Sequence, residues 1–206
     1  MTPLRVLVAC EFSGIVRDAF IAKGHDAVSC DLLPSERPGP HIEGDVLAEL
    51  RKPWDMMIAF PPCTHLCSSG AVYWPQKQVD GRQRAAADFF LSLVNAPIHR
   101  VAVENPVGIM SRLYRKPDQI INPCQFGQPF LKKTCLWLNG LPLLVPTNVV
   151  QPTKHWHGGS PRGGKKKDGT RTASKLMTAL KYGWKERSRT FQGIATAMAD
   201  QWGAKP

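Results

Sequence analysis

Residues 4–31 read LRVLVACEFSGIVRDAFIAKGHDAVSCD and carry the clearest structural signal in the chain. Leu4–Ala9 is an apolar run with β-branched residues, interrupted only by Arg5, which favours a buried strand. A helical pattern follows Ser13-Gly14 and ends at Gly24. Its apolar face consists of Ile15, Val16, Ala19 and Phe20. Ala27–Cys30 then predicts a second strand, so the segment forms a β-α-β unit with parallel strands.

The same alternation continues along the chain. Met56–Phe60 predicts a third strand, which Pro61-Pro62 halts because proline has no N–H to donate. Arg82–Val94 predicts a helix, and Val101–Val103 predicts a fourth strand that ends at Glu104-Asn105-Pro106. We therefore expect an α/β fold with an open, doubly wound, mostly parallel sheet, whose ligands bind outside the carboxyl ends of the strands.

Length and charge limit the possible functions. The chain has 206 residues, 43% of them hydrophobic, which suits one core and is too short for two ordinary domains. We expect a single domain over 1–206. Lysine and arginine number 27 against 16 acidic residues, for a net charge of +11. This balance favours a nucleic-acid partner, although a basic protein without such a partner would have the same composition.

The sequence also predicts a cytoplasmic protein. Met1–Ala9 lacks the architecture of a signal peptide, and no apolar stretch approaches the length of a membrane span. In that compartment the six cysteines are expected to be packing residues, a nucleophile or metal ligands, and not disulfides. We expect no membrane contact and no obligate protein partner.

Cys63 and Glu104 have the side chains that methylation of a cytosine ring requires. Carbon 5 is too weak a nucleophile to attack a sulfonium unaided. A thiolate that adds to carbon 6 activates carbon 5, and a carboxylic acid near ring nitrogen 3 stabilises the charge that develops there. Taken alone, the two residues could equally be a packing cysteine and a turn at a strand end.

From Val6 to about Gly203 the chain resembles the cytosine-carbon-5 DNA methyltransferase family. DMMIAFPPC at 55–63, followed by Ser68-Ser69-Gly70, is similar to the family's Pro-Cys nucleophile loop. Glu104-Asn105-Pro106 stands where the family has Glu-Asn-Val. The resemblance implies a Rossmann-like methyltransferase domain in which Cys63 is the nucleophile, Glu104 assists and Asn105 contacts the substrate. Cysteine after the prolines also favours ring-carbon chemistry over methylation of an amino group.

The resemblance implies S-adenosylmethionine as the cofactor. Glu11-Phe12-Ser13-Gly14 looks like the family's first cofactor-binding motif, and Asp31 occupies the place of the acid that binds the ribose. Asp45 resembles the residue that meets the adenine amine. The expected cofactor contacts are Phe12, Ser13, Gly14, Asp31, Asp45 and Pro61.

The chain departs from the family after Phe126-Gly127-Gln128-Pro129, which resembles the opening of the next motif. The Gln-x-Arg-x-Arg expected there is replaced by FLKKT at 130–134. Lys132 and Lys133 keep the positive charge but lack the bidentate fork of arginine, and we expect them to contact the substrate. Gly193–Ala197 loosely resembles the family's last motif.

The family's target-recognition region is reduced here to a basic segment. Residues 142–175 are rich in proline, glycine and basic side chains, which predicts a loop without regular structure. The side chains expected to follow phosphates or stack on bases are Trp156, Arg162, Lys165, Lys166, Lys167 and Arg171. A solvated linker is an equally good interpretation.

Cys63, His65 and Cys67 are closely spaced, with His155 and His157 further on, and residues of these types can bind zinc. The nucleophile role already accounts for Cys63, so we expect no metal.

The sequence thus predicts a DNA (cytosine-5-)-methyltransferase that acts on duplex or single-stranded DNA. The same chemistry on a cytosine nucleotide, and a catalytically silent DNA-binding protein of this fold, remain as alternatives. So compact an enzyme would suit a phage or prophage that marks its own DNA against restriction in the cytoplasm of a bacterial host.

Overall fold

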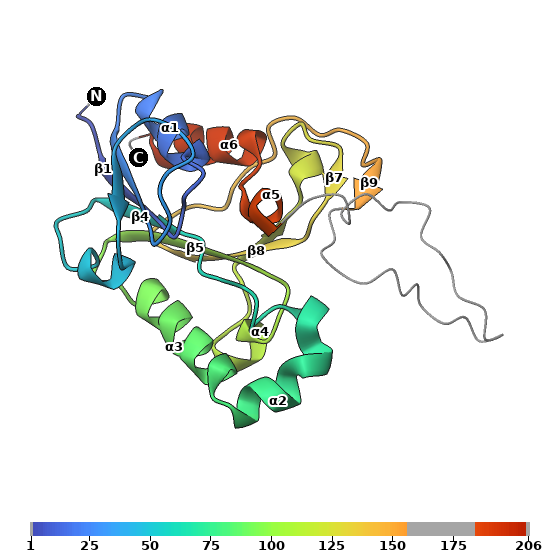
Figure 1. The fold of residues 1–206 in the computed structure, drawn as a ribbon. Coiled ribbons are helices and arrows are strands. Elements are labelled where there is room, and N and C mark those ends of the chain that lie inside the picture. Colours follow the sequence, from blue (N-terminus) through green and yellow to red (C-terminus); the bar gives the residue numbers. More distant parts are fainter. Residues whose placement is uncertain (1, 156–183, 205–206) are drawn as a thin grey trace.

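The computed structural model describes residues 2–155 and 184–204, which form an α/β fold around a seven-stranded sheet (Figure 1). The strands are β1 (Arg5–Ala9), β2 (Asp26–Asp31), β3 (His41–Glu43), β4 (Met56–Ala59), β5 (Arg100–Pro106), β6 (Gln119–Ile121) and β8 (Thr134–Asn139). Their order is β3-β2-β1-β4-β5-β8-β6. The first five strands pair in parallel, and β8 runs antiparallel to both of its neighbours. The predicted doubly wound, mostly parallel sheet is confirmed.

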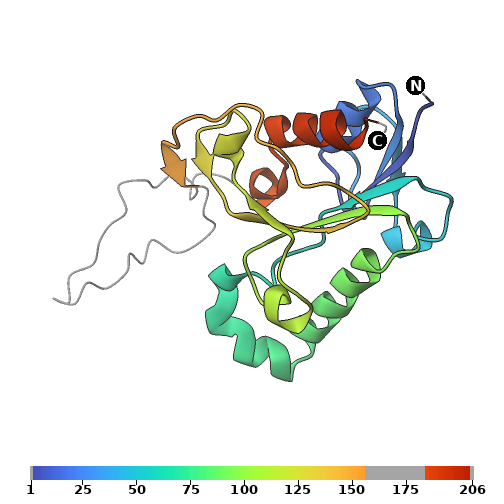
Figure 2. The ribbon, with the colours of Figure 1, turned by 180° about the vertical axis from the view of Figure 1, so that it is seen from behind.

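Helices cover both faces of the sheet (Figures 1 and 2). They are α1 (Ile15–Ile21), α2 (Trp74–Val79), α3 (Arg82–Val94), α4 (Met110–Leu113), α5 (Trp184–Ser188) and α6 (Gln192–Trp202). Helices α1 and α6 pack together on one face, where the fully buried Trp202 anchors α6. Helix α3 lies on the other face.

The strand sequences produce two cores because successive side chains of a strand point to opposite faces. In β1, Val6 and Val8 join the core under α1 and α6, whereas Leu7 and Ala9 join the core under α3. The other inner strands alternate in the same way, which explains why they read as unbroken apolar runs.

The connections fix where a ligand can bind. The chain passes from β1 to β2 through α1 on one face, and from β4 to β5 through α3 on the other. The strand order therefore reverses between β1 and β4. In an open sheet, the carboxyl ends at such a reversal border a crevice. The residues that follow β1 and β4 border this crevice, and those at the end of β5 lie next to it.

The structure extends the predicted fourth strand. Glu104, Asn105 and Pro106 belong to β5 and do not follow it, because β8 pairs with them in antiparallel register. Glu104 lies opposite Leu136, and Asn105 lies opposite Cys135. Strands β3, β6 and β8 were not predicted from the sequence.

The segment expected to be a loop, 142–175, is described as far as residue 155. Residues 142–153 form no helix or strand, and β9 (Lys154–His155) then pairs with β7 (Phe130–Leu131). The early part is nevertheless tied to the domain. Leu144 is buried, and its N–H donates to Gln119 Oε1 at 2.8 Å.

Candidate active site

Cys63 lies in a single tight turn after the end of β4. The N–H groups of Leu66 and Cys67 both donate to the carbonyl of Cys63, at 3.0 and 2.9 Å. We call residues 63–67 the Cys63 turn. Pro61 and Pro62 separate it from the strand, so the backbone is free to leave the sheet there. The Cys63 side chain is half-buried.

The end of β5 is joined to the Cys63 turn by hydrogen bonds. Asn105 is buried, and its Nδ2 donates to the carbonyl of Pro61 at 3.0 Å. Beyond it, the N–H of Ile109 donates to the carbonyl of Leu66 at 2.9 Å. The N–H of Ser68 donates to the carbonyl of Val107 at 2.9 Å. These contacts tie the segment at the end of β5 to the Cys63 turn, which follows β4.

Gly108 allows this close approach. A Cβ atom there would lie 2.2 Å from the Leu66 carbonyl oxygen and 2.9 Å from Cys67 Cα, which are backbone atoms that cannot rotate away. Gly108→Ala should therefore lower the free energy of unfolding by about 1–3 kcal/mol, measured by urea denaturation. Gly44→Ala is the control, because nothing lies within 4 Å of its Cβ position. Equal stability of the two variants would mean that the segment at Gly108 and the Cys63 turn can move apart without loss of stability.

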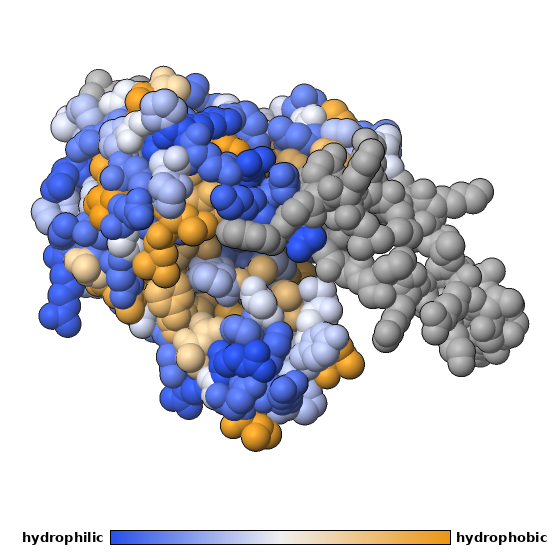
Figure 3. Space-filling model, in the orientation of Figure 1, coloured by the Kyte–Doolittle hydropathy of each residue, from blue (hydrophilic) through white to orange (hydrophobic). Residues whose placement is uncertain are grey.

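Glu104 is half-buried, and its carboxyl holds its proton more tightly than that of an exposed glutamate. Burial raises the pKa of its carboxyl above the usual range, and the nearby Lys132 only partly opposes the shift. Glu104 also acts electrostatically on the Cys63 thiol, so the two groups are close. It lines a small pocket together with Phe60, Lys132, Thr134, Ser188, Thr190, Phe191, Ile194 and Met198. Figure 3 shows the molecule from the side seen in Figure 1. Less polar residues gather there in a hollow between two hydrophilic regions.

The structure separates the two lysines expected to contact substrate. Lys132 is half-buried and lines the pocket beside Glu104, with its Nζ donating to the carbonyl of Arg187 at 3.4 Å. Lys133 is exposed and does not line this pocket. Lys132 therefore lies beside Glu104, whereas Lys133 points to the surface.

The turn after β1 places an acid at the beginning of α1. Glu11 is buried, and its Oε1 accepts from the Ser13 hydroxyl at 2.8 Å and from the Val16 N–H at 2.9 Å. Burial raises the pKa of this carboxyl. In dinucleotide-binding folds the cofactor pyrophosphate binds at this helix end. A phosphate would compete here with a side chain of the protein itself, so the turn suits a ligand without phosphate groups.

The other residues predicted to bind a cofactor border the same crevice. Phe12 and Ser13 are buried in the turn, and Gly14 has φ +71°, a conformation that favours glycine. Asp31 is half-buried at the end of β2, and burial raises the pKa of its carboxyl. Asp45 is exposed and caps a 3₁₀ turn, Val46–Ala48, by accepting from the Leu47 N–H.

These two acids lie near each other. Both act electrostatically on Cys10, whose thiol pKa is raised chiefly by burial and then by these neighbours. Cys10 itself has φ +57°, which turns the chain sharply out of β1 toward Glu11.

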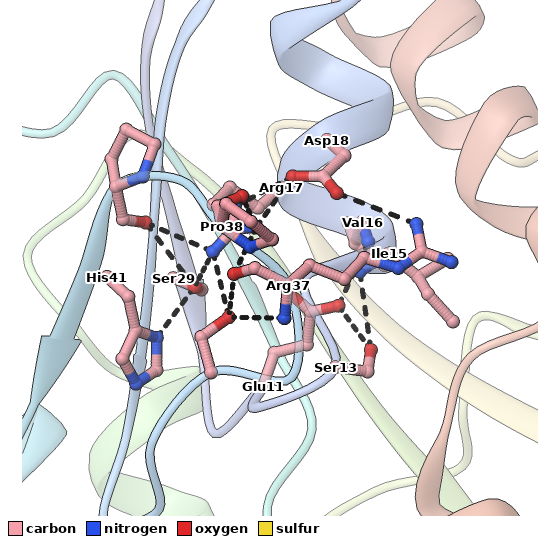
Figure 4. A network of polar contacts seen from close by, with 12 residues as sticks. Glu11, Ser13, Ile15, Val16, Arg17, Asp18, Ser29, Arg37, Pro38 and His41 are labelled. Atoms are coloured by element: carbon pink, nitrogen blue, oxygen red, sulfur yellow. Dashed lines mark hydrogen bonds and ion pairs between the residues drawn. The ribbon is translucent and has the colours of Figure 1, made fainter.

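Sequence reasoning missed Arg17, the centre of the network in Figure 4. Its side chain is fully buried, and its guanidinium donates to the Ser29 and Ser35 hydroxyls and to the carbonyl of Pro38, at 3.2, 3.1 and 3.0 Å. It also pairs with Asp18 at 2.8 Å. Arg17 thereby ties the loop that follows Asp31 to helix α1. A basic residue on a helix gives no sign in the sequence that it will be buried.

Several predicted residues cannot be located. Trp156, Arg162, Lys165, Lys166, Lys167 and Arg171 lie outside the described residues. Within 2–155 and 184–204, no three histidine, cysteine or acidic side chains are grouped so as to hold a metal ion. No helix in these two ranges is long and apolar enough to cross a membrane.

No family model matches the sequence, and no curated protein matches it. Among solved structures, the fold is similar to a protein from an E. coli prophage described as a DNA modification methyltransferase, with 15% identity and a TM-score of 0.47. That match covers 72% of this chain and 52% of the other. The Entamoeba histolytica methyltransferase EhMeth matches at 11% identity and a TM-score of 0.47, over 73% of this chain and 58% of its own. The chain thus spans little more than half the length of either protein.

Proposed function

We propose that this protein transfers a methyl group from S-adenosylmethionine to carbon 5 of cytosine in DNA. The observation that carries the proposal is the placement of a cysteine thiol and of a carboxyl group with a raised pKa at the ends of two adjacent strands. A thiol has no use in methylating an amino group, whose nitrogen already holds a lone pair. Addition to a ring carbon needs both groups.

The chemistry divides between the two residues. Cys63 Sγ forms a bond to carbon 6 of the ring. The electron pair of the carbon 5–carbon 6 double bond moves through carbon 4 to nitrogen 3, which takes the proton of Glu104, so that the ring becomes an enamine. Lys132 then stabilises the Glu104 carboxylate. The enamine makes carbon 5 nucleophilic enough to accept a methyl group. A base then removes the proton of carbon 5, the electron pair of that C–H bond re-forms the carbon 5–carbon 6 double bond, and Cys63 leaves as thiolate while nitrogen 3 returns its proton to Glu104.

The crevice fits the proposed cofactor. S-adenosylmethionine supplies an electrophilic methyl group when bound, and it carries no phosphate to conflict with Glu11. Phe12, Ser13, Gly14 and Pro61 would contact it. The Asp31 carboxylate would hold the ribose hydroxyls, and Asp45 would accept from the adenine amine. These assignments follow the family resemblance and the common position of the residues around the crevice.

For DNA we propose contacts from Asn105, Lys132 and Lys133, and from the basic segment with Trp156, Arg162, Lys165, Lys166, Lys167 and Arg171. The net charge of +11 supports a polyanionic substrate. We further propose that the protein works in the cytoplasm of a bacterium as the modification enzyme of a phage or prophage.

The test is transfer of labelled methyl to duplex DNA, single-stranded DNA and free cytosine nucleotide, followed by nucleoside analysis. Label in 5-methylcytosine from DNA is the expected result. Label in a methylated amino group of adenine or cytosine would overturn the proposed chemistry. Label in the free nucleotide alone would mean that the substrate is a cytosine nucleotide and not DNA. No label despite measured binding of cofactor and DNA would indicate the silent binding protein.

A further inference from the structure

The loop between β2 and β3 is fixed both to helix α1 and to the turn after β1. The guanidinium of Arg17 donates to the Ser35 hydroxyl at 3.1 Å and to the carbonyl of Pro38 at 3.0 Å. These two contacts lie on either side of Glu36 in the sequence. The N–H of Glu36 itself donates to the carbonyl of Phe12 at 2.8 Å. The backbone at Glu36 is therefore held against the turn where we propose that the cofactor binds.

The side chain of Glu36 reaches a segment near the other end of the chain. Its two carboxylate oxygens accept from Nε and Nη2 of Arg189, both at 2.8 Å. Such a paired contact uses the planar fork of arginine, which fixes orientation as well as distance. Arg189 stands between Ser188 and Thr190, and both of these residues line the pocket beside Glu104. The ion pair thus joins the turn after β1 to one wall of that pocket.

This ion pair suits a geometric role better than a stabilising one. The side chains of Arg189 and Glu36 are 38% and 26% exposed, and a partly solvated pair adds little to the free energy of unfolding. The support beneath it is much firmer, because Arg17 is fully buried. Two glycines make room for the Arg17 guanidinium, since a Cβ atom at Gly14 or Gly39 would lie within 2.9 Å of it. The Glu36 carboxylate is therefore presented to Arg189 from a rigid base.

We propose that Glu36 is a positioning residue for methyl transfer, a role that rests on the function proposed above. Through Arg189 it holds residues 188–191 at a set distance from the turn after β1. The cofactor in the crevice and the cytosine beside Glu104 are thereby kept in register, and methyl transfer requires the reacting atoms to be close and aligned. Glu36 is not among the proposed contacts of either reactant. Its loss should therefore leave both reactants bound and slow the transfer between them.

The first measurement needs no substrate. Hydrogen exchange of the backbone amides in residues 186–193 is compared in the wild type, Glu36→Gln, Arg189→Gln and the variant with both changes. Each variant should exchange about two- to fivefold faster than the wild type, which is the range for one exposed ion pair. The double variant should exchange no faster than the single ones, because all three lack the same contact.

Asp88→Asn is the matched control for hydrogen exchange. Both carboxylate oxygens of Asp88 accept from Arg84 Nε, at 2.9 and 2.8 Å, in an exposed ion pair on α3, across the sheet from α6. Loss of this pair should leave the exchange of residues 186–193 unchanged. If Glu36→Gln exchanges no faster than Asp88→Asn in this segment, the proposal is overturned.

The second measurement separates binding from transfer. Glu36→Gln should lower kcat by about 10-fold, while its Kd for S-adenosylmethionine, its KM for DNA and its urea midpoint stay close to those of Asp88→Asn. Arg189→Lys keeps the charge without the fork, so its kcat should lie between those of the wild type and Glu36→Gln. An unchanged kcat, or a loss explained by weaker binding or a lower urea midpoint, would also overturn the proposal. If Glu36→Gln speeds exchange but the wild type transfers no methyl, the proposed function fails and the link from Glu36 to residues 188–191 stands.

Discussion

Cys63→Ala is expected to lower methyl transfer by about 10⁴-fold or more and to abolish covalent attachment to DNA that contains 5-fluorocytosine. The fluorine at carbon 5 cannot leave as a proton does, so the wild-type protein should remain bound to the ring through the Cys63 sulfur. A denaturing gel separates the adduct from free protein. Without the thiol no bond to carbon 6 forms, and carbon 5 stays unreactive.

The control for this experiment is Cys124→Ala, since Cys124 is buried outside the Cys63 turn. It should form the adduct as the wild type does. Cys63→Ala should bind S-adenosylmethionine with an affinity close to that of the wild type by calorimetry, because Cys63 is not among the proposed cofactor contacts. An adduct formed by Cys63→Ala would assign the nucleophile to another residue.

Glu104→Gln should have opposite effects on activity and stability. Glutamine cannot give a proton to the ring, so methyl transfer should fall by about 10²–10³-fold. Stability should rise at alkaline pH. The folded-state pKa of Glu104 is raised, so the unfolded chain loses this proton first, and the wild type loses stability as the pH rises through that interval. Glutamine does not titrate and escapes this loss.

Urea denaturation at pH 4 and pH 8 tests the stability effect, with Glu43→Gln as the matched control. Glu43 is exposed in β3, so its replacement should change neither stability nor methyl transfer appreciably. The Glu104→Gln variant should gain stability over the wild type at pH 8 and not at pH 4. A variant that is less stable than the wild type at pH 8 would mean that Glu104 is ionised and paired in the folded protein.

The wild-type rate should also decline at high pH, because only protonated Glu104 can donate to the ring. The decline should follow the raised pKa of this carboxyl. A rate that stays level up to pH 9 would exclude Glu104 as the proton donor.

The central strands could be predicted because they are buried on both faces and read as apolar runs. Strand β8 has such a run, Cys135–Leu138, but nothing local shows that it returns antiparallel beside β5. Strand β3 is three residues long and only partly buried, so it has no pattern to read. These elements depend on pairing partners far away in the sequence.

Some residues of the candidate site could also be predicted from the sequence, and others could not. Cys63 and Glu104 could be placed because each was expected at the carboxyl end of a neighbouring strand. The burial of Arg17 and the close approach of Gly108 to Leu66 are set by tertiary contacts. Lys132 and Lys133 are identical residues side by side, and only the path of the chain before β8 distinguishes them.

The pocket beside Glu104 is closed by two parts of the chain that are made at different times. Phe60, Glu104 and Lys132 belong to the sheet side, whereas Ser188, Phe191 and Met198 come from the segment around α6. During translation the sheet residues leave the ribosome first. A nascent chain can therefore pair its central strands while the pocket is still open on one side, and the closed pocket arises only when residues 188–198 emerge and α6 docks against α1. The central sheet can therefore form before the pocket beside Glu104 is complete.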